Sequence, residues 1–167
     1  MKTKSAVLLV AACLIVGGWT SQAMAKDMKT GYINLSQVFD SYEKTKTADA
    51  DLQQKAEAKS AEREALVDSI KQMRDELEML STDMRAEKQA AIDEKVQELQ
   101  AFDRDSRLVL RRERDAMIRD ILKEIDEIVQ KYGQDKGYDY IFNDRVLLFK
   151  KEQNDISAEI TDLLNAK

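Results

Sequence analysis

Two kinds of side chain in this sequence are placed for chemistry, and the first is arginine. Four arginines follow one another at intervals of three, four and three residues: Arg104, Arg107, Arg111 and Arg114. A helix would align them in one stripe, and a row of guanidinium groups can bind phosphate or carboxylate groups. The alternative, which we favour, is that these arginines pair with acids of a second helix at Asp49, Asp51 and Glu57.

The second kind is methionine, whose flexible thioether adapts to varied apolar partners. The central part of the sequence contains Met73, Met79, Met84 and Met117. Met73 and Met84 share the apolar stripe described below. Met79 lies off that stripe, so we expect it to be available for contact with a partner.

The sequence predicts no catalytic site. It contains no histidine, and its one cysteine, Cys13, lies in an apolar N-terminal segment. We find no glycine-rich phosphate loop and no carboxylate pair of the kind that active sites use. Acids spaced four residues apart are typical of a solvated helix face rather than of a metal site. We therefore expect no enzymatic activity, no cofactor and no metal.

The N-terminus has the pattern of a secretory signal. Lys2 and Lys4 precede an apolar stretch at 6–16, and small residues precede a cleavage position after Ala25. The stretch is shorter than the roughly 20 residues of a membrane-spanning helix, which makes a permanent anchor the weaker alternative. Lipid attachment at Cys13 is another alternative, but the residues after it continue the apolar stretch. We expect an exported chain that begins at residue 26.

Composition limits the choice of partner. The formal net charge is −5, and removal of a signal that contains two lysines and no acid makes the remainder more acidic. A nucleic acid is therefore not an expected partner. If Cys13 leaves with the signal, no disulfide holds the fold.

The middle of the chain is predicted to form a long helical arm. From Tyr32 to Tyr132 there is no glycine and no proline. Apolar residues recur there at alternating intervals of three and four, which is the pattern of a coiled-coil seam. The seam residues are Leu66, Ile70, Met73, Leu77, Leu80, Met84, Ile92, Val96 and Leu99. A stripe this narrow must be buried against another helix.

We expect the arm to be a hairpin rather than one straight helix. Residues 81–83 (STD) favour caps and turns, and a reversal there pairs residues whose numbers sum to about 165. In that register apolar residues face each other: Leu66 with Leu99, Ile70 with Val96, and Met73 with Ile92. The polar interruptions nearer the root also meet with opposite charge: Lys59 and Arg63 near Asp103 and Asp105, and Asp49 and Asp51 near Arg112 and Arg114. A straight helix would not explain this correspondence.

Residues before and after the arm are predicted to form one small β-rich body. Segment 31–35 is typical of a strand, and segments 137–142 and 145–149 are typical of a β-hairpin turned at Asn143-Asp144. Gly133 is expected to end the second arm helix, and an amphipathic helix is expected after Asp155. The fold class is therefore α+β, with a three-stranded sheet and a helical hairpin.

This interpretation divides the chain into four parts. They are the signal (1–25), the first part of the body (26–43), the hairpin arm (44–132, tip near 81–84) and the second part of the body (133–167). The sheet would have open edges and the body is too small to bury its aromatic residues, so a closed homo-oligomer is expected. The residues expected at its interface are Tyr32, Ile33, Leu35, Val38, Phe39, Tyr140, Phe142, Leu147 and Phe149.

Three short segments carry a resemblance to a known family. They are 31–39 (GYINLSQVF), 137–139 (GYD) and 155–157 (DIS), in this order around a long helical run. With them the chain resembles the Skp/OmpH family of periplasmic chaperones. The resemblance implies a periplasmic homotrimer whose three helical hairpins surround a cavity. It also implies an ATP-independent holdase that keeps unfolded outer-membrane proteins soluble for assembly.

The resemblance also suggests what the residues noted first could contact. Met79, Arg104, Arg107 and Arg111 are candidate contacts for a client or a lipid. The best-known member of the family is basic, whereas this chain is acidic, which weakens the expectation of transient membrane or lipopolysaccharide contact. The alternative function is a structural coiled-coil adaptor or spacer of the envelope, which would bind one folded partner.

Overall fold

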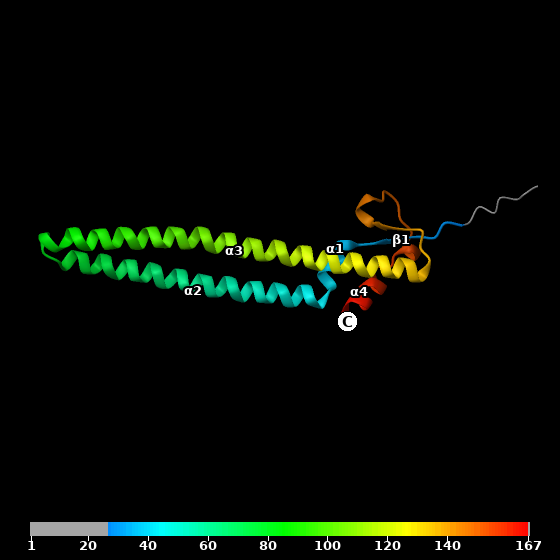
Figure 1. Ribbon diagram of the computed structural model, residues 1–167, viewed down its shortest axis with the longest axis horizontal. Coiled ribbons are helices and arrows are strands. Elements are labelled where there is room, and N and C mark those ends of the chain that lie inside the picture. The colour runs from blue at the N-terminus through cyan, green and yellow to red at the C-terminus, as the bar shows by residue number, and fades with distance from the viewer. Residues whose placement is uncertain (1–26, 167) are drawn as a thin grey trace, which may run out of the picture.

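A computed structural model describes residues 27–166, which form a long two-helix arm attached to a small body (Figure 1). The predicted signal segment and its cleavage position lie outside these residues. The elements are β1 (Thr30–Ile33), α1 (Leu35–Ser41), α2 (Glu43–Met79), α3 (Thr82–Lys136), β2 (Tyr140–Asn143), two 3-10 turns (Asp144–Val146 and Glu152–Asn154) and α4 (Ser157–Asn165). The chain has an α+β fold with a helical hairpin, as predicted.

The arm consists of α2 and α3, which lie side by side and antiparallel (Figure 1). The helices end and begin at Met79 and Thr82, so the reversal is confined to Leu80 and Ser81, at the near end of the range predicted for the tip. No residue between them and the body interrupts either helix, because the segment lacks glycine and proline up to Gly133.

Ion pairs between the two helices confirm the predicted register. Arg63 Nε lies 3.0 Å from Asp103 Oδ1, and Lys55 Nζ lies 2.7 Å from Glu113 Oε2. Lys88 pairs with Glu76 near the tip, and Lys44 pairs with Glu124 near the root. Each pair has residue numbers that sum to about 165, the value expected for a reversal at the tip.

Of the predicted charge contacts between the helices, only that of Arg63 with Asp103 is formed as an ion pair. Within residues 27–166, neither Asp49 nor Asp51 pairs with Arg112 or Arg114, and Lys59 has a different partner. Lys59 was expected near Asp103 and Asp105, but its Nζ binds Glu62 on its own helix at 2.8 Å. The same ammonium group lies 5.3 Å from the centre of the Phe102 ring. A close acid at i+3 and an aromatic face across the seam therefore hold this lysine.

The seam between α2 and α3 is fully buried at only a few positions. Ile70 and Ile92 are buried, whereas the other predicted seam residues except Met84 are half-buried, as expected for two helices without a third layer. Met84 is 57% exposed, so its assignment to the seam is wrong. The register places Leu80 or Ser81 opposite Met84, and both belong to the turn rather than to α2, so no helical surface stands opposite it.

The sheet of the body differs from the prediction. β1 pairs with β2 in parallel, with Gly31 opposite Ile141 and Tyr32 opposite Phe142. Residues 145–149 do not form a strand, so the predicted β-hairpin and three-stranded sheet are wrong. The Asn143 side chain accepts a hydrogen bond from Arg145 N at 3.1 Å and starts a 3-10 turn instead. β1 also makes a single bridge to Asp155 through Tyr32.

Gly133 does not end α3 as expected, and Gly137 ends the helix instead. Helix α3 continues through Gly133, which is buried, and a Cβ there would lie 3.2 Å from Ile141 Cδ1. Gly133 therefore allows β2 to approach α3. The helix ends at Gly137, whose φ of 68° is the left-handed conformation typical of a helix C-terminus.

The core of the body is largely helical rather than β-rich. Nine buried residues form it: Ile33, Val38, Tyr42, Ile121, Ile125, Ile128, Ile156, Ile160 and Leu164. They come from β1, α1, the root of α3 and the C-terminal segment with α4. Burial of this cluster therefore joins the two ends of the chain to the root of the arm.

We predict that Ile160→Ala will lower the free energy of unfolding by about 2–4 kcal/mol, because it leaves a cavity in a fully buried position. Leu163→Ala on the same helix removes a similar side chain that is 43% exposed, and it serves as the matched control. Urea unfolding followed by circular dichroism measures both variants. Equal losses would contradict the assignment of the core.

Alkaline pH is predicted to destabilise the fold. Burial raises the pKa of Tyr42 and Tyr132, and a hydrogen bond to Glu124 raises the pKa of Lys44. These groups favour the folded state in their protonated form, so their contribution is complete below the ordinary tyrosine and lysine pKa of about 10 and is lost above it. Melting temperatures should be constant from about pH 7 to 9 and fall beyond about pH 10. A constant melting temperature up to pH 11 would contradict this prediction.

Candidate binding surfaces

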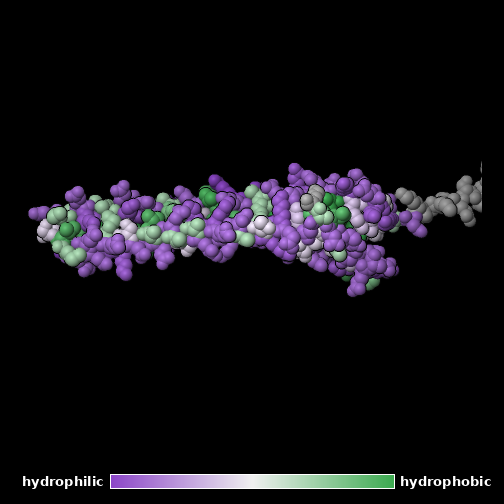
Figure 2. Space-filling model, turned by 90° about the horizontal axis from the view of Figure 1, so that it is seen from below, coloured by the Kyte–Doolittle hydropathy of each residue, from purple (hydrophilic) through white to green (hydrophobic). Residues whose placement is uncertain are grey.

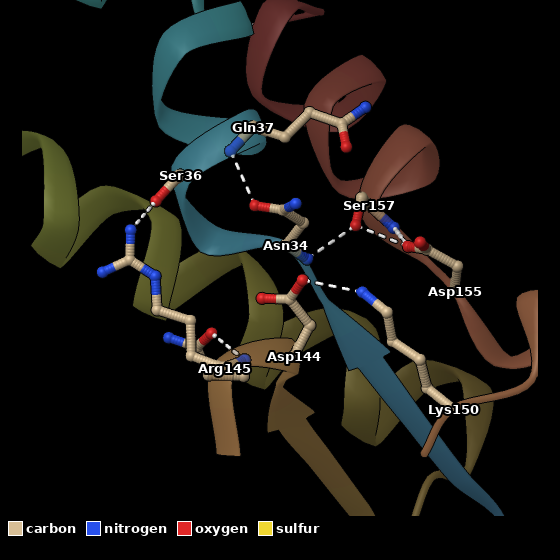
Figure 3. A network of polar contacts seen from close by, with 9 residues as sticks. Asn34, Ser36, Gln37, Asp144, Arg145, Lys150, Asp155 and Ser157 are labelled. Atoms are coloured by element: carbon tan, nitrogen blue, oxygen red, sulfur yellow. Dashed lines mark hydrogen bonds and ion pairs between the residues drawn. The ribbon is translucent and has the colours of Figure 1, made fainter. Parts of the chain in front are cut away.

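A network of hydrogen bonds joins the two ends of the body (Figure 3). Asn34 N donates to Ser157 Oγ at 2.8 Å, and Ser157 N and Oγ both donate to Asp155 Oδ1. The Asn34 side chain accepts from Gln37 N at 3.0 Å and caps α1. Two of the segments that resemble the family, 31–39 and 155–157, therefore contact each other and fix the start of both short helices.

The segment after β2 is held against the body by polar side chains. Lys150 Nζ lies 2.8 Å from Asp144 Oδ2, and Arg145 Nη2 donates to Ser36 Oγ at 2.5 Å (Figure 3). Lys150 Nζ also lies 4.9 Å from the centre of the Tyr32 ring. These contacts fix both ends of a short irregular segment, in which Val146, Leu148 and Phe149 are exposed.

Five large apolar side chains of this region are exposed, and we call them the body patch. They are Tyr140, Phe142, Val146, Leu148 and Phe149. The Tyr140 and Phe142 rings stack with centroids 6.0 Å apart, and Phe149 is 80% exposed. A group of exposed aromatic and aliphatic side chains beside an open strand edge is typical of a protein interface.

The residues predicted for the interface fall into three groups by exposure. Tyr32, Ile33 and Val38 are buried within the chain itself, and Leu35, Phe39 and Leu147 are half-buried. Tyr140, Phe142 and Phe149 belong to the body patch. Val146 and Leu148 were not among the residues predicted for the interface. Their position in the apolar run 146–149 was the signal that could have identified them.

The arginine stripe lies on an exposed part of α3. Arg104, Arg107 and Arg111 are exposed, and among residues 27–166 none of them forms an ion pair. Arg107 Nε instead donates to the carbonyl oxygen of Asp103 at 3.0 Å. The favoured pairing with acids of α2 is therefore not formed. Lys55 and Arg63 occupy the cross-helix ion pairs, and the stripe is left facing solvent.

A shallow groove between α2 and α3 lies beside this stripe. Its volume is about 340 Å³, and its lining residues are Asp49, Leu52, Gln53, Ala56, Leu110 and Arg114. Asp49 and Arg114 line it from opposite helices without an ion pair between them in the described part of the chain. The groove shows that α2 and α3 are not closely packed at this level of the arm.

Met79 is 80% exposed at the tip of the arm. Figure 2 shows apolar atoms at this far end among hydrophilic ones. Together with the arginine stripe, the tip places the four residues predicted for client or lipid contact on the surface. The structure does not bring them into one site, because Met79 is the last residue of α2 at the tip, whereas the three arginines lie within α3 (Figure 1).

The corner between α1 and α2 is fixed by Glu124 of α3. Tyr42, where the chain turns from α1 to α2, donates from its hydroxyl to Glu124 Oε2 at 2.9 Å, and Lys44 pairs with Oε1. Burial and this hydrogen bond raise the pKa of Tyr42, which favours the protonated hydroxyl that donates the bond. The contacts of Tyr42 and Lys44 with Glu124 therefore fix the orientation of the root of the arm relative to the body.

Residues 27–166 contain no group of three side chains placed to hold a metal ion. Among the same residues, no helix combines the length and apolar composition of a membrane span.

These features define a class of protein in which a helical hairpin arm projects from a small α+β body. The chain belongs to the OmpH-like family, because the family described as outer membrane protein (OmpH-like) matches residues 29–164. The recognition of this family from three short segments is confirmed. No curated protein shows significant sequence similarity to the chain.

A solved structure has the same fold. It is a crystal structure of a protein from Caulobacter crescentus CB15 that is described as a candidate outer membrane chaperone (OmpH-like). The two chains are 13% identical, with a TM-score of 0.78, and the match covers 83% of this chain and 85% of the other. The fold is therefore kept although few residues are shared.

We predict that Glu124→Gln will loosen the root of the arm. The variant removes a charged partner of Tyr42 and Lys44, and because the site is partly exposed the loss should be about 1–2 kcal/mol. Hydrogen exchange should become faster in residues 43–50. Glu127→Gln, on the same helix and paired only loosely with Lys123 at 3.8 Å, is the matched control. Unchanged exchange in the Glu124 variant would contradict this role.

Proposed function

We propose that this chain is an ATP-independent periplasmic holdase that binds unfolded outer-membrane proteins between helical arms and keeps them soluble for assembly. Membership of the OmpH-like family supports this proposal. The observation that carries it is the arm itself. Helix α3 has 55 residues and is about 80 Å long at 1.5 Å per residue, yet most of the arm has no other layer packed on it.

The surface of the arm suits weak contacts with an unfolded chain. Val67, Leu108, Val109 and Leu122 are each at least 37% exposed, and charged residues such as Asp68, Arg107 and Lys123 lie beside them in the sequence. Each side chain offers a small apolar contact, and many such contacts along a client add up by multivalency. Single contacts that are weak allow release without ATP. The charged residues between them keep the free arm in solution.

We infer that three copies assemble through the body patch. Each copy exposes apolar side chains at an open strand edge, and covering them in a closed ring removes that edge. Three arms would then extend from one end and enclose a cavity. An exported chain that begins at Lys26 would place the assembly in the periplasm.

The arginine stripe supports a second contact. Arg104, Arg107 and Arg111 are exposed and unpaired within the described part of the chain, so they are available to carboxylates of a client or to phosphates of a lipid or lipopolysaccharide. The acidic residues elsewhere on the arm oppose a stable membrane contact, so that contact would be transient.

A structural envelope adaptor or spacer is the alternative function, and the exposed Met79 at the tip of a long arm favours it. The two functions differ in their partners. An adaptor binds one folded partner through its tip, whereas a holdase binds many unfolded membrane proteins and ignores folded ones.

The experiment that tests the proposed function is dilution of a urea-unfolded outer-membrane β-barrel protein with and without the purified chain. We expect light scattering to be suppressed and a soluble complex of one client with three copies to appear in size exclusion. The same β-barrel protein folded in detergent should not bind. Precipitation of the client alone would contradict the holdase and favour the adaptor.

We predict that Phe149→Glu will convert the trimer to monomers, because a charge cannot be buried at the proposed interface without large cost. The fold of each copy should survive, since Phe149 is 80% exposed. Val67→Glu, on the arm, is the matched control and should remain trimeric. Light scattering coupled to size exclusion measures the mass, and a trimeric Phe149 variant would contradict this assignment of the interface.

A further inference from the structure

The methionines of the described chain differ sharply in exposure. Met79 is 80% exposed and Met84 is 57% exposed, and they flank the turn at the tip. Met73 and Met117 are half-buried, the first in the seam and the second against the core of the body. Residues 27–166 contain no cysteine, so thioethers are the only sulfur there.

The turn does not need these two methionines for its structure. Arg85 Nε donates to the carbonyl oxygen of Leu80 at 2.9 Å, and Arg85 Nη2 donates to that of Glu78 at 3.3 Å. These bonds satisfy carbonyl groups at the C-terminus of α2. Lys88 pairs with Glu76 one turn below and holds the helices together. The tip is therefore fixed by polar groups, and both thioethers are left free for contact.

From this arrangement we propose that Met79 and Met84 form an oxidation-sensitive contact at the tip, which peroxide inactivates by converting both thioethers to sulfoxides. The oxidant is hydrogen peroxide. One sulfur–oxygen bond forms and the oxygen–oxygen bond breaks. The sulfur is oxidised by two electrons, the peroxide is reduced, and water leaves. A thiol-dependent sulfoxide reductase would restore the thioether.

Oxidation changes the tip from apolar to polar while leaving the fold in place. A sulfoxide is a strong hydrogen-bond acceptor, and its burial against an apolar client is unfavourable. The body and the polar bonds of the turn are not altered, so the arm keeps its structure. This inference rests on the proposed function, because it assumes that the tip contacts an unfolded apolar chain.

The experiment treats the purified protein with hydrogen peroxide and maps oxidation by peptide mass spectrometry over time. Met79 and Met84 should be oxidised well before Met73 and Met117. Binding of an unfolded β-barrel protein, measured by fluorescence anisotropy, should weaken by about threefold or more after treatment, since a loss on each of several arms is multiplied. Treatment with a sulfoxide reductase and a thiol should restore binding.

Two double variants test whether oxidation of the tip methionines causes the loss of binding. Met79→Leu with Met84→Leu should give equal binding before and after peroxide, whatever its binding before treatment. Met73→Leu with Met117→Leu keeps the tip and should lose binding on treatment as the unmodified protein does. Met28 is 61% exposed and will also be oxidised, but both variants retain it, so the comparison removes its contribution.

The outcomes separate this inference from the proposed function. Failure of the untreated protein to bind any unfolded client overturns both. Binding by the untreated protein that is equally strong after oxidation of Met79 and Met84 overturns only the role of the tip. Equal oxidation rates for tip and half-buried methionines, or loss of binding in the Met79 and Met84 double variant on treatment, also overturn it.

Discussion

The fold depends on a parallel pairing between two strands that the whole arm separates in sequence. Lys29 N donates to Asp139 Oδ2 at 2.8 Å across 110 positions, and β1 and β2 pair immediately beyond. Closing so large a loop costs conformational entropy, and burial of the core around Ile125 and Ile160 offsets that cost. Both roots of the arm are thereby held at one body, and the arm is free to project.

The body is the rigid part of the molecule, and the arm is the adaptable part. The body has a contiguous core from four elements, whereas the arm is held by a narrow seam and by exposed ion pairs that contribute little individually. A groove lined by Leu52 and Leu110 shows that the two helices are not closely packed at that level of the arm. Bending is expected there, since local motion follows low apolar contact. A rigid base with adaptable arms is what the proposed binding of unfolded clients of different size would require.

The sequence predicted the arm better than the body, for physical reasons. The spacing of Ile70 and Ile92 and the charges of Arg63 and Asp103 each depend only on helix geometry, so they fixed the register. The run 145–149 has strand propensity, but the cap by Asn143 and the bond between Asp144 and Lys150 prevent a hairpin. Such tertiary contacts cannot be inferred from the local sequence pattern. For the same reason the exposure of the arginine stripe could not be predicted from sequence.

The central claim is that clients are held between arms whose tips move around them. Spin labels attached to Ser81→Cys at the exposed turn report the distances between tips in the assembly by electron spin resonance. The account predicts a broad distribution for the free protein and a clearly different one when an unfolded β-barrel protein is bound, with no change on adding the folded barrel. An identical distribution with and without bound unfolded client would contradict it.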